Sequence, residues 1–214
     1  YQFSRGFFTL NLAGNVDGTV MQREGLMKNG RGQVTYVDEN GMTQTADVSY
    51  GKSGKGRFLS GGGRAQMTFR PTANHLLTVA GIATTEAPLA RNSFVAPRIQ
   101  NNFVDHLTSE KIYSTELAYR FRIGDVTAKV AGYYTLFTDG VEQTAFYNDQ
   151  ENRFTYLTMS GIRREHMGVE VALKWYITSN LSFNVLGTLS DARYTNNPLA
   201  QVNYEGMNAG TIAE

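Results

Sequence analysis

Residues 110–140 alternate between apolar and polar side chains almost without a break, and only Ile123-Gly124-Asp125 interrupts them. A period of two is the period of a β-strand, because successive side chains of a strand point to opposite faces of its sheet. Each half of this stretch continues for about ten residues or more, roughly twice the usual strand of about 5 to 6. The pattern therefore predicts a pair of unusually long antiparallel strands joined by a tight turn.

The same alternation recurs elsewhere in the chain. It covers residues 8–16, 64–70, 75–84, 166–177 and 181–190. Together with the pair in 110–140, these segments predict an all-β fold of about seven long strands, and an eighth strand after Gln201 is left open.

The length of the strands fits a lipid bilayer. An apolar band about 25 Å tall, crossed by strands tilted about 45° that rise about 3.3 Å per residue, needs about 11 residues per crossing. The sequence contains no run of about 18 apolar residues, which excludes a transmembrane helix. We therefore expect the strands of an antiparallel transmembrane β-barrel, whose alternating faces average to a mildly polar hydropathy.

The connections between the predicted strands are unequal in a regular way. Tight turns are expected at residues 71–74, 123–125 and 178–180, whereas long connections are expected at residues 17–63, 85–109 and 140–165. Short and long connections alternate along the chain. Bacterial outer-membrane barrels have short periplasmic turns and long extracellular loops, so this order gives the chain an orientation. Within the first long connection, Asn40-Gly41 between residues 34–37 and 42–46 predicts a hairpin.

Aromatic residues are predicted at both ends of the strands. Tyr119, Phe121, Trp175, Tyr176 and Phe183 lie near the tight turns, and Tyr113, Tyr133, Tyr134 and Phe137 lie toward the long connections. Two such groups are what the interfacial girdles of a barrel require. Aromatic residues also favour strands in soluble proteins, so their positions are weaker evidence for a barrel than the order of short and long connections.

Charged residues recur on the polar face of the predicted strands. They are Glu116, Arg120, Arg122, Lys129, Glu170 and Lys174. Burying unpaired charges in an apolar core would cost several kcal/mol for each. We therefore expect this face to line a lumen that is polar, wet or filled by another polar surface, while the apolar face contacts lipid.

Motifs for catalysis, metal binding or nucleic-acid binding are weak. The 20 basic and 19 acidic residues give a net charge near +1, so no nucleic-acid partner is indicated. There is no cysteine, which excludes disulfides and thiolate metal sites and is compatible with an oxidising compartment. The histidines His75, His106 and His166 lack ligand spacing, no serine stands in a nucleophile elbow, and Asp38-Glu39-Asn40-Gly41 is better explained as a turn than as a calcium loop. We predict no enzyme, no cofactor and no metal site.

Several segments, in order, resemble one family of membrane proteins. They are NSFVAPRIQNN (92–102), EKIYSTELAY (110–119), GYYTLFTD (132–139), Gly161-Ile162 and HMGVE (166–170). This succession is similar to the barrel of TonB-dependent outer-membrane receptors of the Bacteroidetes type, over roughly residues 55–195. The resemblance implies a barrel of 22 strands around an N-terminal plug. We recognise no plug, no TonB box and no terminal aromatic strand in residues 1–214, so we expect this chain to be a partial barrel domain.

The resemblance also implies a function and partners. It implies an importer in the cell outer membrane whose extracellular loops capture a scarce solute, such as a siderophore, cobalamin, glycan or peptide. Outer-membrane lipid would surround it, the TonB complex would act through the plug, and a surface lipoprotein could form a lid. The candidate capture residues are Arg91, Phe94, Arg98, Tyr147, Phe154 and Tyr156, although the sequence favours a role in loop packing for each, and Phe94 in particular is explained as a loop anchor. The competing functions are a passive porin or small structural outer-membrane barrel, and a soluble β-rich adhesin or binding module.

Overall fold

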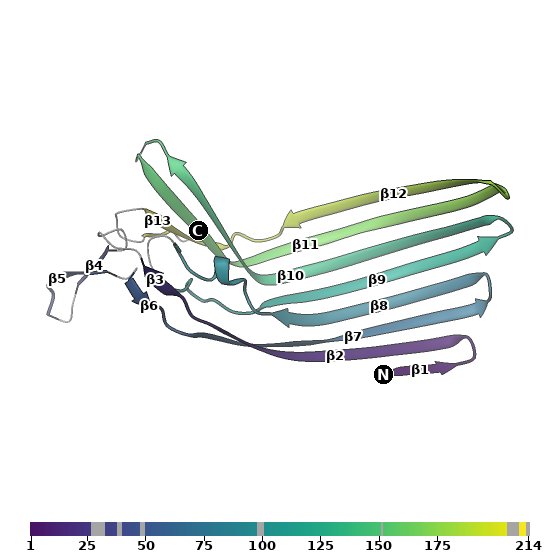
Figure 1. Ribbon diagram of the computed structural model, residues 1–214, viewed down its shortest axis with the longest axis horizontal. Coiled ribbons are helices and arrows are strands. Elements are labelled where there is room, and N and C mark those ends of the chain that lie inside the picture. Colours follow the sequence, from purple (N-terminus) through teal and green to yellow (C-terminus); the bar gives the residue numbers. More distant parts are fainter. Residues whose placement is uncertain are drawn as a thin grey trace.

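The computed structural model describes residues 1–26, 33–37, 40–47, 50–97, 101–150, 152–204 and 210–212. Over these residues the fold is all-β, and its helical part is one turn of 3-10 helix, η1 (Ala90–Asn92). Ten strands form a single open antiparallel sheet in the order β1-β2-β7-β8-β9-β10-β11-β13-β14, in which β12 also pairs with β11 (Figure 1). No helix in the described ranges is long and apolar enough to cross a membrane.

Seven strands of the sheet are long. They are β2 (Phe8–Met21), β7 (Gly56–Thr72), β8 (His75–Glu86), β9 (Glu110–Ile123), β10 (Val126–Asn148), β11 (Arg153–Thr178) and β12 (Leu181–Tyr194). Each contains one of the seven predicted segments, so the predicted long strands are confirmed. The short strands are β1 (Gln2–Arg5), β13 (Leu199–Tyr204) and β14 (Gly210–Ile212), and β13 begins two residues before Gln201, where the eighth strand was left open.

Two small ribbons lie outside the main sheet. The strand β4 (Gln33–Val37) pairs with β5 (Thr43–Asp47), and β3 (Glu24–Leu26) pairs with β6 (Tyr50–Lys52). The β4–β5 pair confirms the hairpin that was predicted around Asn40-Gly41. Residues 38 and 39 of its turn lie outside the described residues.

Four two-residue turns lie at one end of the sheet, at the right of Figure 1. They join β1 to β2, β7 to β8, β9 to β10 and β11 to β12. Gly124 takes a positive φ of 54° in the β9–β10 turn, a conformation that favours glycine because it has no Cβ. The connections β2–β7 and β8–β9 lie at the opposite end, here called the loop end, so the predicted inequality of the two ends holds for these connections.

The structure differs from the sequence prediction in residues 140–165. These residues do not form a long loop, because β10 continues to Asn148 and β11 begins at Arg153. The ladder between them shifts register at Gly140, where Asp139 and Gly161 have φ angles of 62° and 71°. Beyond this shift the hairpin bends away from the rest of the sheet (Figure 1). The two extra residues interrupt the simple alternation, which is why the pattern alone ended the strands too early.

The register across the sheet separates an apolar face from a charged face. Directly paired residues share a face, and one continuous row runs Phe3, Leu10, Met67, Val79, Leu117, Gly132, Val169, Leu189 from β1 to β12. The next row toward the turns runs Phe8, Phe69, Leu77, Tyr119, Val130, Val171, Gly187. The alternation predicted for each strand separately therefore keeps one register across seven neighbouring strands.

The apolar face forms no dry protein core. Leu117 is 55% exposed, Val171 46% and Val185 42%, because no second layer covers this face in the described chain. Most of the buried residues instead gather at the loop end, and Ala118, Ala128 and Ala131 are small buried residues of the long strands. The loop-end group includes Ser93, Phe94, Val95, Ala96, Asn101, Val104, Tyr156, Thr158, Ile162, Val202 and Asn203. The only compact packing among the described residues is thus at the loop end, where the candidate site lies.

The aromatic residues divide between the two faces, which corrects the girdle prediction in part. Tyr119, Phe121, Trp175, Phe183, Tyr113 and Tyr134 lie on the apolar face, as interfacial girdles would require. Tyr133, Phe137 and Tyr176 pair with Gly168, Arg164 and Ser182 and therefore lie on the charged face. There they contact charged or glycine neighbours, for example Tyr176, whose ring lies 4.5 Å from Lys174 Nζ.

Candidate functional site at the loop end

The structure separates the predicted capture residues into buried and exposed ones. Phe94 and Tyr156 are only 5% and 4% exposed, so they pack the loop end instead of offering a contact surface. Arg91 is exposed on η1. Tyr147 and Phe154 are exposed near the tip of the β10–β11 hairpin and contact each other edge to face, with ring centroids 5.4 Å apart. Tyr147 Oη also donates a hydrogen bond to Asn152.

Arg98, the remaining predicted capture residue, lies outside the described residues. The other five come from two segments: the β8–β9 connection, which includes η1, and the bent end of the β10–β11 hairpin. The sequence prediction therefore named side chains from one end of the sheet, but it included two that are packed inside.

The buried part of the β8–β9 connection is fastened to the bent hairpin. Gln143 Nε2 donates to the backbone oxygens of Phe94, at 2.7 Å, and Val95, at 2.9 Å. Thr158 Oγ1 also donates to Val95 O at 2.9 Å. Phe94 and Phe103 stack with ring centroids 4.6 Å apart. These contacts satisfy buried backbone acceptors and hold the loop as a fixed layer over the hairpin.

The same loop is tied to the connection between β2 and β7. Arg23 Nη1 donates to Asn101 Oδ1 at 2.7 Å, and Asn101 Nδ2 donates to the Gly51 oxygen at 2.9 Å. The Arg23 guanidinium lies 5.9 Å from the centre of the Phe94 ring, and its partial burial lowers its pKa. Ser53, which is buried, accepts a hydrogen bond from the Arg23 amide at 2.8 Å. Three chain segments that are distant in sequence thus meet at the loop end.

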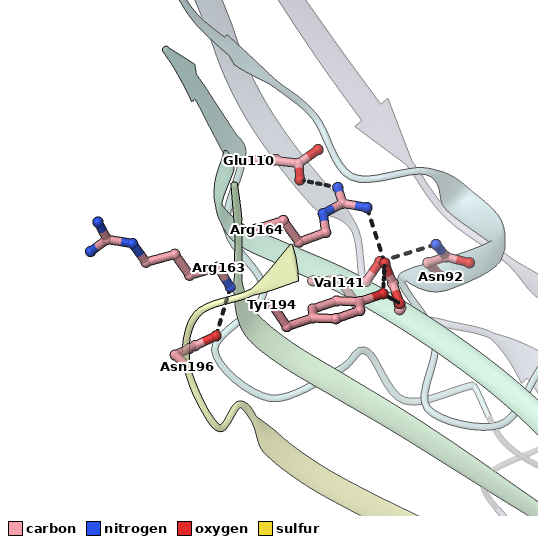
Figure 2. A network of polar contacts seen from close by, with 8 residues as sticks. Asn92, Glu110, Val141, Arg163, Arg164, Tyr194 and Asn196 are labelled. Carbon is pink, nitrogen blue, oxygen red and sulfur yellow. Dashed lines mark hydrogen bonds and ion pairs between the residues drawn. The ribbon is translucent and has the colours of Figure 1, made fainter. Parts of the chain in front are cut away.

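A charged cluster stands where the hairpin bends (Figure 2). Arg164 donates to Glu110 Oε1 through Nη2 at 2.7 Å and to Glu142 Oε1 through Nη1 at 3.0 Å. Tyr194 Oη donates to Glu142 Oε2 at 3.0 Å. The Arg164 guanidinium also lies 5.0 Å from the centre of the Phe137 ring. One side chain of β11 therefore links carboxylates of β9 and β10, and β12 joins through its tyrosine.

The backbone of the bend is closed by a second set of hydrogen bonds (Figure 2). Asn196 Oδ1 accepts from the Arg163 amide at 2.8 Å, and Asn196 Nδ2 donates to the Gly161 oxygen at 2.7 Å. At this level β11 changes its partner, from β12 below the bend to β13 above it. Asn196 thus satisfies the polar groups that the register shift leaves without a strand partner.

A polar cavity of about 710 Å³ lies in the angle of the bend. Its lining side chains include Glu86, Arg91, Asn92, Glu110, Asp139, Glu142, Gln143 and Arg164. Asn92 Nδ2 donates to the Val141 oxygen at 3.1 Å and fastens η1 to the hairpin (Figure 2). The volume lies within the range of about 300 to 1,000 Å³ that is usual for small-molecule sites. The arrangement offers hydrogen-bond donors and acceptors to a polar solute and contains no nucleophile–base pair of a hydrolase.

The six charged residues predicted to line a lumen share one face of the sheet. Arg120 pairs directly with Lys129, Lys174 pairs with Thr127 beside Arg122, and Glu170 pairs with Ala131. Glu116, the sixth, pairs with Tyr133 on the same face. Neither Glu116 nor Glu170 forms an ion pair with Arg120, Arg122 or Lys174 among the described residues.

The sequence prediction missed the most connected residues of the loop end. Arg164, Glu142 and Gln143 fall in the segment that was expected to be a loop, and Glu110 was quoted only as part of a motif. Their roles depend on the bend of the hairpin, which brings residues 110, 142 and 164 together. The glycines at 140 and 161 were the available signal, because isolated glycines within a strand indicate a bulge.

Comparison of the chain with protein families, with curated proteins and with solved structures gave no match. Within the described ranges, no group of three or more histidine, aspartate or glutamate side chains could hold a metal ion. The two faces of the sheet and the loop-end cavity are therefore the features that bear on function.

Proposed function

We propose that this chain is part of the wall of an outer-membrane β-barrel that imports a solute with energy from TonB. The observation that carries this proposal is the exposed apolar face, which keeps one register over seven neighbouring strands. A soluble protein rarely exposes a contiguous apolar patch of more than a few hundred Å², since such a surface would associate in water. Contact with lipid is the simplest explanation for an exposed apolar face of this kind.

The height of the apolar face supports the same proposal. On the apolar side of β11, the charged residues at the loop end are Asp191, which pairs with Met167, and Glu165, which pairs with Arg193; Trp175 pairs with Phe183 near the turns. Eight residue steps separate Met167 from Trp175 and ten separate Glu165 from Trp175; at about 3.3 Å per residue and a tilt of about 45°, they span about 19 Å and about 23 Å. These heights compare with the apolar band of about 25 Å in outer-membrane barrels.

The loop-end cavity is the proposed capture site. It lies at the end of the sheet that carries the long connections, and it is lined by Arg91 and by the Arg164 cluster. In an importer of this class, capture at the extracellular end would precede passage through the lumen. The resemblance of residues 55–195 to TonB-dependent receptors is what favours energised import over a passive pore.

Membrane insertion is tested by spin labels placed one at a time at positions 126–135 of the full-length protein in lipid vesicles. We expect labels at even positions, which share the face of Val130, to collide with dissolved oxygen, which concentrates in lipid. Labels at odd positions, which share the face of Lys129, are expected to collide with a water-soluble nickel reagent or to be shielded. A pattern without a period of two, or protein that stays in the supernatant without detergent, would favour a soluble adhesin.

Energised import is tested by uptake into cells that carry or lack the gene. The probes are a radiolabelled ferric siderophore, cobalamin, a short glycan and a short peptide. We expect uptake of one probe that stops when an uncoupler collapses the proton gradient. Uptake that persists in the uncoupled cells would identify a passive porin.

A further inference from the structure

Two carboxylates face each other at the loop-end cavity. Glu86 and Glu110 are the last direct pair of the β8–β9 ladder, and both line the cavity. In such a pair the Cβ atoms lie about 4.5–5.5 Å apart, and like charges are destabilising. Arg164 Nη2 donates to Glu110 Oε1 at 2.7 Å (Figure 2). Glu86 forms no ion pair or side-chain hydrogen bond in the part of the chain that the structure describes, so it faces a second carboxylate without a cation of its own.

The described lining of the cavity is short of cations. Its carboxylates are those of Glu86, Glu110, Asp139 and Glu142, and its cations are Arg91 and Arg164. The single charge of Arg164 is shared between Glu110 and Glu142. Asp139 is paired with Lys111, which is not part of the lining, and even with this lysine the carboxylates outnumber the cations. The charge of the cavity is therefore complementary to a solute with a positive group.

We propose that the loop-end cavity holds an ammonium or guanidinium group of the captured solute between Glu86 and Glu110. This inference rests on the proposed function, because it names the chemical class of the solute that the same site captures. An ammonium group has three donors, so it can bond to both carboxylates at once and replace their repulsion by charge-assisted hydrogen bonds. Arg91 forms no ion pair among the described residues and is free to meet a carboxylate of the same solute.

The size and the side chains of the cavity favour an organic cation over a metal ion. Its volume of about 710 Å³ suits a small molecule. Over the described ranges, no group of three or more histidine, aspartate or glutamate side chains could hold a metal ion. Among siderophores, cobalamin, glycans and peptides, a short peptide is the solute that regularly carries both an ammonium and a carboxylate group. We therefore expect the site to prefer peptides that contain lysine or arginine.

The test uses the full-length protein in phosphatidylcholine vesicles, which carry no net charge, and a random library of short peptides. Peptides that stay bound after washing are identified by mass spectrometry, with protein-free vesicles as the blank. We expect lysine and arginine to be about threefold more frequent in bound peptides than in the library, as for a partly exposed ion pair. Glu86→Gln should abolish this enrichment, and it should fold because it relieves a like-charge pair. Glu170→Gln makes the same change in charge on the same face away from the cavity and should leave the enrichment unchanged.

The inference is overturned if no peptide binds, if bound peptides show no excess of lysine and arginine, or if Glu86→Gln behaves like the parent protein. Failure of the proposed function is measured separately, by uptake of the same library into cells that carry the gene. Peptides that enter energised cells without a preference for lysine and arginine would refute the charge class and keep the importer. An enrichment in vesicles that Glu86→Gln abolishes, without uptake by energised cells, would refute the importer and keep the binding site.

Discussion

An arginine at position 171 should lower the free energy of unfolding far more than an arginine at the same height on the opposite face of the sheet. Val171 pairs with Val130 on the apolar face, and both are exposed on the described chain. Counted along β11, Val171 lies six residues from the charged level at Glu165 and four from Trp175. At about 3.3 Å per residue and a tilt of about 45°, these steps correspond to about 14 Å and 9 Å. The side chain is therefore near the middle of the proposed apolar band.

The expected magnitude follows from this depth. An arginine near the midplane of an outer-membrane barrel costs about 2–4 kcal/mol on the lipid face. Val171→Arg should lower the free energy of unfolding by that amount. Thr188→Arg is the matched control, because Thr188 is exposed on the charged face directly opposite Glu170. There the new charge can meet a carboxylate, so the change should stay within about 1 kcal/mol.

The measurement is guanidinium unfolding of the full-length protein from lipid vesicles, followed by tryptophan fluorescence. The difference between the midpoints of the two variants, multiplied by the slope of the parent protein, gives the difference in free energy. Equal losses for the two variants would contradict the assignment of the faces. A larger loss for Thr188→Arg would mean that the faces are reversed.

Three further changes probe the packing of the described chain. Gly168→Ala should lower the free energy of unfolding by about 1–3 kcal/mol, because a Cβ there would lie 2.7 Å from both Tyr133 Oη and the Leu189 oxygen. Gly187→Ala is the control: a Cβ there would meet open space, so it should lower the free energy less in the same guanidinium titration. Gln143→Leu should speed hydrogen exchange in residues 93–97 and 101–104 while leaving β9 protected, and equal exchange in both would refute the fastening role of Gln143. A double-mutant cycle of Arg164→Gln and Glu142→Gln should give a coupling of about 1 kcal/mol, since both side chains are partly exposed; zero coupling would show the pair to be incidental.

The long strands between the tight turns and the bend were predictable from sequence because their side chains alternate between apolar and polar. In β9, β10 and β12 the alternation of side chains persists for most of the strand, and two-residue turns join the hairpins. A strand partner that is next in sequence and joined by a tight turn has a register that the turn itself sets. The faces of Leu117 and Glu116 could therefore be assigned without knowing any distant contact. The short strand β1 was missed, because four residues give too little periodicity to be distinguished from a loop.

The loop end was less predictable because its contacts join segments that are far apart in sequence. Phe94 was named both as a capture candidate and as a loop anchor, and its burial favours the anchor; the sequence does not indicate that its neighbours would be Gln143 and Phe103. Tyr156 was expected in a loop and lies in a strand instead, where it is buried. Residue type alone therefore could not separate packing aromatics from exposed ones.

The bend of the β10–β11 hairpin connects these two parts of the molecule. On the side of the tight turns, Arg164 pairs with Phe137 in the regular β10–β11 ladder; beyond the bend, Val141 pairs with Ser160. Each strand inserts one extra residue between these pairs, so the ladder resumes on both sides while the hairpin changes direction. The Arg164 side chain forms ion pairs with Glu142, beyond the bend, and with Glu110 of β9. The two extra residues that interrupt the alternation thus also produce the bend beside which the polar cavity lies. A straight hairpin would have neither the bend nor the cavity.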